Sequence, residues 1–140
     1  MRSRRSADGS STAIKDEKEF AETYDPLFNL YQVDIALQSH THYYERFFPM
    51  KFDSNNDGAP MVIETDTKEY NNVGGTVYFT IGTGGAELME FGPKKEFSAV
   101  RFIEYGVLNF DLENNGQTLA GTFYGNNDEI LDSFKITKYS

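Results

Sequence analysis

Residues 33–46 of the chain read VDIALQSHTHYYER, and the fold prediction starts from them. Residues 33–38 are mostly apolar and rich in strand-forming types, which predicts a buried β-strand rather than a half-exposed one. The strand runs into His40 and His42, the only two histidines of the 140 residues. Residues i and i+2 share a face of an extended segment, and neutral imidazole is a good ligand for zinc and iron. The pair can therefore face one metal ion or two neighbouring ones. A hydrogen-bonded histidine pair beside a turn is the alternative.

The composition favours a folded, acidic domain. Hydrophobic residues make up 39% and aromatic residues 15%, with 12 Phe and 9 Tyr, which suits a globular core of aromatic sheets. Thirteen basic against 22 acidic residues leave a formal charge of −9, which disfavours binding to nucleic acids and to anionic membranes. The chain has no cysteine, so a disulfide framework, a thiolate metal site and a thiol nucleophile are excluded.

The N-terminal part predicts a flexible segment followed by a helix. Residues 1–13 are rich in Ser, Gly and Arg, and their basic start is followed by polar residues where a signal peptide needs an apolar region. No run approaches the length of a transmembrane helix. Apolar residues at helical spacing predict a helix from near Ala13 to Asp25, and Pro26 predicts that only a short second turn follows.

The remainder of the chain predicts β-strands joined by tight turns. A glycine-rich segment, residues 82–85, is interpreted as a strand-ending turn rather than a phosphate-binding loop. Asn115-Gly116 is a strong signal for a type I′ hairpin turn, and a second turn is expected at residues 125–128. The expected strands are residues 60–65 and 76–81, then a three-stranded meander formed by 105–112, 117–124 and 129–138.

Residues 33–46 resemble the last metal-binding block of the purple acid phosphatase family of binuclear metallophosphoesterases, in which an apolar strand runs into Gly-His-x-His-x-Tyr-Glu-Arg. Three further parts are similar to that family's preceding helix, following strand with glycine turn, and closing hairpins: residues 20–31, 77–85, and 105–108 with 132–136. The resemblance implies an α/β fold, the C-terminal half of an αββα sandwich, with one or two helices and then mostly antiparallel strands. Residues 14–140 would be the C-terminal portion of such a domain.

The resemblance implies an acid phosphatase that hydrolyses phosphate monoesters by two-metal hydroxide attack. Its centre commonly pairs iron with zinc, manganese or a second iron. By that resemblance His40 would bind the divalent metal and His42 the ferric one. Glu45 and Arg46 match the tail of the motif and are expected to form an ion pair that holds the ligand loop, or else a surface ion pair beside a turn. An extracellular or lysosomal location is also implied.

Two departures from the family pattern limit these expectations. Ser39 replaces the glycine of the motif. The family's earlier ligand blocks are missing, and the chain has no third histidine. We therefore expect a C-terminal fragment of a longer enzyme, or a truncated relative, that is inactive alone and contains no complete set of catalytic residues. Its partners would be a phosphate monoester substrate and the missing N-terminal half. A non-catalytic β-rich interaction domain derived from the same fold is the alternative.

A second metal pattern covers residues 53–64, DSNNDGAPMVIE. It satisfies the calcium-loop spacing, with Asp53, Asn55, Asp57 and Glu64 at ligand positions. However, the flanks predict a turn and a strand where an EF-hand needs helices, and Pro60 removes a backbone donor. A polar surface turn rich in Asp and Asn is the alternative.

Overall fold

A computed structural model describes residues 10–53, 55 and 59–139 of the chain. Residues 1–9, most of the predicted flexible segment, lie outside this part. The elements, in chain order, are α1 (Ser10–Leu30), β1 (Ile35–Gln38), β2 (Tyr44–Phe47), β3 (Met50–Asp53), β4 (Ala59–Val62), β5 (Glu69–Asn71), β6 (Val77–Ile81), β7 (Ser98–Phe102), β8 (Gly106–Glu113), a short 3-10 helix (Asn114–Gly116), β9 (Thr118–Gly125) and β10 (Ile130–Thr137).

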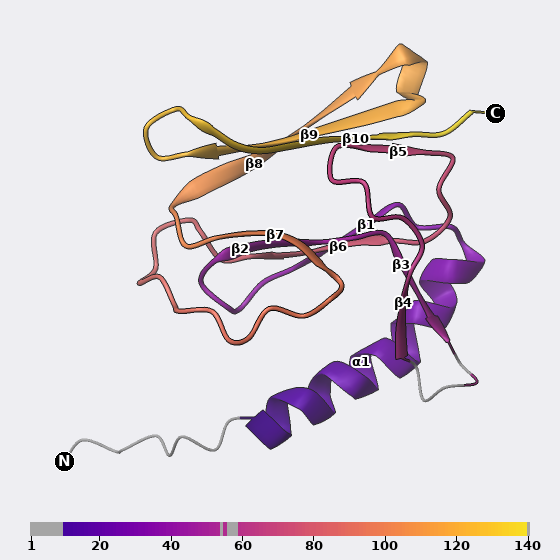
Figure 1. The fold of residues 1–140 in the computed structure, drawn as a ribbon, viewed down its shortest axis with the longest axis horizontal. Coiled ribbons are helices and arrows are strands. Elements are labelled where there is room, and N and C mark those ends of the chain that lie inside the picture. The colour runs from indigo at the N-terminus through magenta and orange to yellow at the C-terminus, as the bar shows by residue number, and fades with distance from the viewer. Residues whose placement is uncertain (1–9, 54, 56–58, 140) are drawn as a thin grey trace.

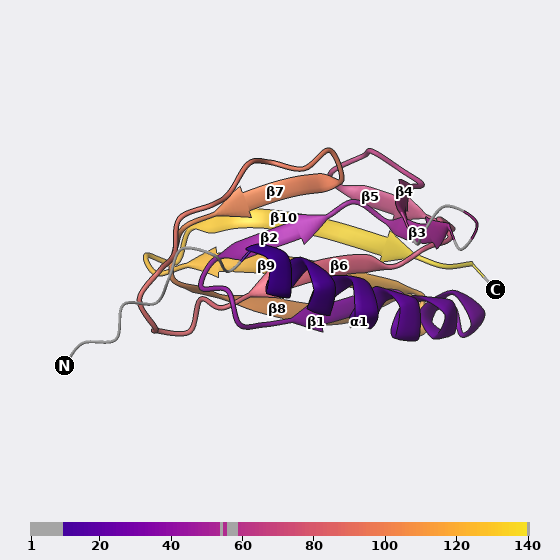
Figure 2. The same ribbon diagram turned by 90° about the horizontal axis from the view of Figure 1, so that it is seen from below.

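Two four-stranded sheets and the helix form three layers (Figure 1). The first sheet has the strand order β1-β6-β2-β7, and the second sheet has the order β5-β10-β9-β8. The helix α1 lies on the face of the first sheet that points away from the second sheet, and it runs along that sheet (Figure 2). Neighbouring strands are antiparallel except in the pairs β1–β6 and β5–β10. The helix–sheet–sheet order is one half of the predicted sandwich.

The helix is continuous, so the prediction of one helix and a separate turn is wrong. It begins at Ser10, before the predicted start near Ala13, and includes Pro26. A proline inside a helix costs about 3 kcal/mol. Contacts with Tyr78 of β6 support the turn around it: the tyrosine hydroxyl donates to Asp25 Oδ1 at 2.6 Å, and the Phe28 and Tyr78 ring centroids lie 6.2 Å apart. No helix in the described residues has the length and apolar character to cross a membrane.

The core between the two sheets is mainly aromatic, as the composition predicted. The rings of Tyr44 and Phe123 stack across the interface, with centroids 4.1 Å apart and planes 9° apart. Phe79 of the first sheet meets Phe134 of the second at 5.4 Å. Offset aromatic pairs add stability beyond the area that they bury. The buried members of this cluster are Tyr44, Tyr70, Val77, Phe79, Phe123, Phe134 and Ile136.

Strand β1 lies at the edge of the first sheet, although its apolar sequence predicted a buried strand. Among the described residues it pairs only with β6. Ile35 is half-buried, while Leu37 is 56% exposed. The prediction was wrong because one edge of the strand has no neighbour here. Strands this apolar are usually covered on both sides.

The C-terminal meander is confirmed, and only the type of its first turn differs. Strands β8, β9 and β10 begin and end within one residue of their predicted bounds, and the second turn follows β9. Glu113 and Thr118 form the last pair of the first hairpin, so four residues separate them, not two. Asn114, Asn115 and Gly116 have φ of 52°, 56° and 82°. Three successive left-handed residues suit Asn and Gly, which tolerate this conformation best.

Asp25 predicts a pH dependence of folding stability. Burial raises the pKa of its carboxyl from 3.8 to about 6, against the lowering effect of the Tyr78 hydrogen bond. The folded protein therefore retains a proton that the unfolded chain loses. This stabilisation is fully present below pH 4 and is lost as the pH rises through about 6. The unfolding free energy of Asp25→Asn, relative to that of the wild type, should therefore rise by up to about 3 kcal/mol between pH 4 and pH 7. Urea unfolding of both proteins at the two pH values measures this change. A difference in unfolding free energy that is the same at both pH values would contradict the prediction.

Candidate metal-binding site

The histidine loop, residues 39–43, connects β1 to β2 and holds a strained backbone. His40 has φ of 110°, a conformation that side-chain-bearing residues rarely adopt. Ser39, where the family motif has glycine, is not among the positive-φ residues, so the left-handed position is the histidine itself. The His40 side chain is exposed. Backbone strain of this kind is often found at binding and catalytic sites.

His42 is held in place by a segment that follows β6. Its ring Nδ1 lies 2.7 Å from the backbone carbonyl oxygen of Glu87. A carbonyl oxygen only accepts hydrogen bonds, so the proton belongs on Nδ1 and the lone pair on Nε2. The backbone N–H of Met89 donates to the carbonyl oxygen of His42 at 3.0 Å. Residues 87–89 therefore fix both the ring and the backbone of His42.

The glycine-rich segment packs against the same loop. A Cβ atom on Gly82 would overlap the carbonyl oxygen of Thr41, so only glycine fits this approach. The Gly82 N–H donates to the Tyr43 carbonyl oxygen at 3.0 Å. Thr83 is buried, and its hydroxyl donates to the carbonyl oxygen of Gly106 at 2.8 Å. The interpretation of residues 82–85 as a strand-ending turn fits these contacts.

The two histidines share one loop, but the described residues do not bring further ligands to them. In the described part of the chain, no cluster of three or more His, Asp or Glu side chains could hold a metal ion. Metal binding by His40 and His42 stays a prediction. Its further ligands would have to come from outside the described residues.

Arg46 does not form the expected ion pair with Glu45. Adjacent strand residues point to opposite faces, and Arg46 is fully buried between the sheets. Its Nε donates to Asp132 Oδ2 at 2.7 Å and its Nη2 to Asp132 Oδ1 at 2.9 Å. The remaining guanidinium donors reach the Tyr70 hydroxyl and the Thr67 carbonyl oxygen. A buried, bidentate ion pair with Asp132 thus replaces both of the arrangements expected for this arginine.

Tyr44 and the ring of Phe134 complete the Arg46–Asp132 network. The Tyr44 hydroxyl donates to Asp132 Oδ2 at 2.7 Å, and the Arg46 guanidinium lies 4.7 Å from the Phe134 ring centroid. Burial raises the pKa of Tyr44 and of Tyr70. Burial alone would lower the pKa of Arg46, but its hydrogen bonds with Asp132 and the charge of that residue raise it. The hydroxyl groups of Tyr44 and Tyr70 and the guanidinium of Arg46 therefore keep their protons at neutral pH.

The calcium-pattern segment begins at the last residue of β3 and contains β4, and these two strands pair antiparallel. Strand β3 lies where an EF-hand needs its first helix, and β4 lies within the pattern itself. Asp53 Oδ1 accepts the backbone N–H of Asn55 at 2.9 Å, which is an Asx turn. Glu64 Oε1 accepts the backbone N–H groups of the next two residues at 2.7 and 3.0 Å. Asp57 lies outside the described residues. The flanking strands favour the polar surface turn over an EF-hand.

Comparisons with known proteins agree with this architecture. Residues 75–133 match the family model described as "Iron/zinc purple acid phosphatase-like protein C". The match begins after the histidine loop. "Probable inactive purple acid phosphatase 1" of Arabidopsis thaliana is 29% identical over 124 residues, which are 84% of this chain and 18% of that protein. A "Nucleotide pyrophosphatase/phosphodiesterase" of Hordeum vulgare is 28% identical over 86% of this chain and 32% of its own length.

A solved structure extends the agreement to three dimensions. The purple acid phosphatase PPD1 from yellow lupin (Lupinus luteus) seeds superimposes with a TM-score of 0.71 and 27% identity, over 81% of this chain and 19% of that one. The fold is an α/β unit similar to part of the metallophosphoesterase sandwich. In sequence and structure the chain is similar to the C-terminal portion of purple acid phosphatases. It spans 18% to 32% of the length of these relatives.

Removing one partner should lower the unfolding free energy much more for the buried pair Arg46–Asp132 than for the exposed pair Lys135–Glu113. Asp132→Asn leaves the Arg46 charge buried without its counter-charge, and it should cost about 3–5 kcal/mol of unfolding free energy. Glu113→Gln removes the pair with Lys135, which is as short, at 2.8 Å, but has side chains 40% and 49% exposed. That control should cost less than about 1 kcal/mol. Urea unfolding compares the two, and similar losses would contradict the role of Asp132.

Proposed function

We propose that this chain supplies His40 and His42 to the two-metal centre of a purple-acid-phosphatase-like hydrolase that cleaves phosphate monoesters. Segments outside the chain would supply the other ligands, so the chain alone would be inactive. The observation that carries the proposal is the hydrogen bond between His42 Nδ1 and the Glu87 carbonyl oxygen. Metal-binding histidines usually donate their second ring nitrogen in this way.

The histidine loop fits a metal on chemical grounds. Both side chains are neutral nitrogen donors of the kind that zinc and iron accept. His42 already has the tautomer that leaves Nε2 available, and His40 is exposed on the same short loop. The family suggests iron with zinc, manganese or a second iron. When bound, such a pair supplies an acidified water and charge neutralisation at the phosphoryl oxygens.

Other residues of this chain would position the two ligand histidines. Glu87 and Met89 fix the ring and the backbone of His42. The network of Arg46 and Asp132 fixes β2, which begins two residues after His42. Ligand orientation of this kind commonly contributes about 10- to 100-fold to metal affinity or activity.

The proposed partner is the N-terminal part of the same domain. The open edge of β1 and the exposed Leu37 support a neighbour there. A row of apolar side chains on α1 and just after it is also uncovered among the described residues: Phe20, Tyr24 and Leu27 on the helix and Tyr31 one residue past its end, between 39% and 74% exposed. Apolar rows on a helix normally face a packed neighbour. An extracellular or lysosomal location belongs to the same proposal.

A non-catalytic domain is the second candidate. Two of the Arabidopsis relatives with over 80% of this chain aligned are named probable inactive purple acid phosphatases 1 and 24. The core between the sheets is well packed without the missing half. A domain of this kind would bind a partner and no metal.

The deciding experiment measures metal content and hydrolysis of p-nitrophenyl phosphate on the native-length polypeptide that contains this chain. The first proposal predicts two bound metal ions and activity. His42→Ala should lower the activity at least about 100-fold, because a ligand is lost rather than its support. Asn126→Ala, in the exposed turn after β9, is the matched control and should retain full activity. A metal-free, inactive protein that is unaffected by His42→Ala would support the second candidate instead.

A further inference from the structure

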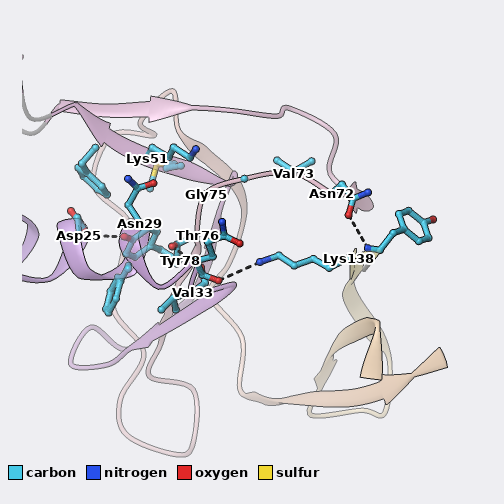
Figure 3. Close-up of a pocket in the computed structure, with 16 residues that line it drawn as sticks. Asp25, Asn29, Val33, Lys51, Asn72, Val73, Gly75, Thr76, Tyr78 and Lys138 are labelled. Carbon is cyan, nitrogen blue, oxygen red and sulfur yellow. Dashed lines mark hydrogen bonds between the residues drawn. The ribbon is translucent and has the colours of Figure 1, made fainter. Parts of the chain in front are cut away.

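Figure 3 shows a cavity of about 310 Å³. It lies at the opposite end of the first sheet from the histidine loop. Strands β1 and β6 run parallel, and the cavity is lined by Val33 and Thr76, which precede them. His40 follows the end of β1. The other walls come from the C-terminal half of α1, from β3 and from Lys138. The cavity is thus separate from the candidate metal site.

Two lysines from different elements line this cavity. Lys51 projects from β3, and its Nζ lies 3.1 Å from where a Cβ on Gly74 would be. It has no hydrogen bond or ion pair to another described residue. Lys138 at the rim is held by Asp34 Oδ1 at 2.6 Å and by the Gln32 carbonyl oxygen at 3.2 Å. Lys51 therefore adds an uncompensated positive charge to a protein whose net charge is −9.

The Gly74-Gly75 turn beside Lys51 lets a ligand approach the backbone. Gly75 has φ of 103°, and a Cβ there would lie 2.8 Å from the Met50 carbonyl oxygen, so the position requires glycine. The N–H groups of both glycines have no hydrogen-bond partner among the described residues. Backbone N–H groups in such turns, together with a lysine, commonly bind anions.

The acidic residue in the cavity lining, Asp25, is compatible with an anion. Asp25 is 5% exposed, its Oδ1 accepts the Tyr78 hydroxyl, and its Oδ2 has no partner among the described residues. Burial raises the pKa of Asp25 to about 6. In mildly acidic solution the group is mostly a neutral carboxylic acid. It then does not repel an anion next to Lys51.

We propose that this cavity binds a phosphate-type oxyanion, with Lys51 and the Gly74-Gly75 turn contacting its oxygens, while Lys138 at the rim stays paired with Asp34. The ion can be free phosphate or the phosphoryl group of a larger molecule. The site does not depend on the proposed hydrolase function, because it shares no residue with the histidine loop.

Isothermal titration calorimetry of the 140-residue chain with inorganic phosphate at pH 5.5 tests the site. We expect one saturable site, and Lys51→Gln should weaken binding at least about tenfold, as for the loss of one hydrogen bond to a charged group. Lys95→Gln, an exposed lysine in the segment before β7, is the matched control and should bind like the wild type. Gly74→Ala, which crowds the Lys51 ammonium group, should also weaken binding. Circular dichroism checks that each variant is folded.

Two further titrations test where phosphate binds and which form of it the cavity accepts. The double variant His40→Ala/His42→Ala should bind phosphate as tightly as the wild type, and a loss there would overturn the proposed location. Glycerol 2-phosphate that competes with phosphate supports a phosphoryl group as ligand, whereas phosphate binding without such competition supports the free ion. No saturable binding, or equal weakening by Lys51→Gln and Lys95→Gln, would overturn the proposal.

Discussion

The buried ion pair between Arg46 and Asp132 is the interaction on which the arrangement of the two sheets depends. It joins β2 of the first sheet to β10 of the second, at a place where both side chains are shielded from water. A buried charge is tolerated only when it is paired and its hydrogen-bonding groups are satisfied. The two oxygens of Asp132 accept two bonds from the guanidinium and one from Tyr44, while Tyr70 and the Thr67 carbonyl bind the rest of Arg46. Loss of any charged member leaves an uncompensated charge in the core.

The position of the candidate ligands follows from this pairing. His42 lies two residues before β2, so the register of that strand sets where the loop begins. Gly82 and residues 87–89 then fix the loop from the side of β6. The described residues therefore hold His42 firmly and contain no cluster of three or more metal-ligating side chains. The chain also leaves one edge of β1 unpaired among the described residues and spans less than a third of the length of its relatives.

Much of the fold could be predicted from local sequence signals. The C-terminal meander was predicted within one residue because alternating apolar residues and Asn-Gly turns act locally. Strand β2 was not predicted, because Glu45 and Arg46 make it look polar until their buried surroundings are known. The continuity of α1 through Pro26 depends on Tyr78, more than 50 residues away. Tertiary contacts of this kind override local propensity.

The candidate site was also predictable only where the signal is local in the sequence. The histidine pair was found from its spacing and from the resemblance of its flanks to a known motif. Asp132 was missed because it lies 86 residues from Arg46, and only its unusual place inside an apolar strand could have drawn attention to it.

A double-mutant cycle with Arg46→Met and Asp132→Leu, measured by urea unfolding, tests most directly whether these residues act as one unit. We expect a coupling free energy of about 2–3 kcal/mol, with the double variant more stable than the sum of the two single losses implies. Losses that add within about 0.5 kcal/mol would contradict it.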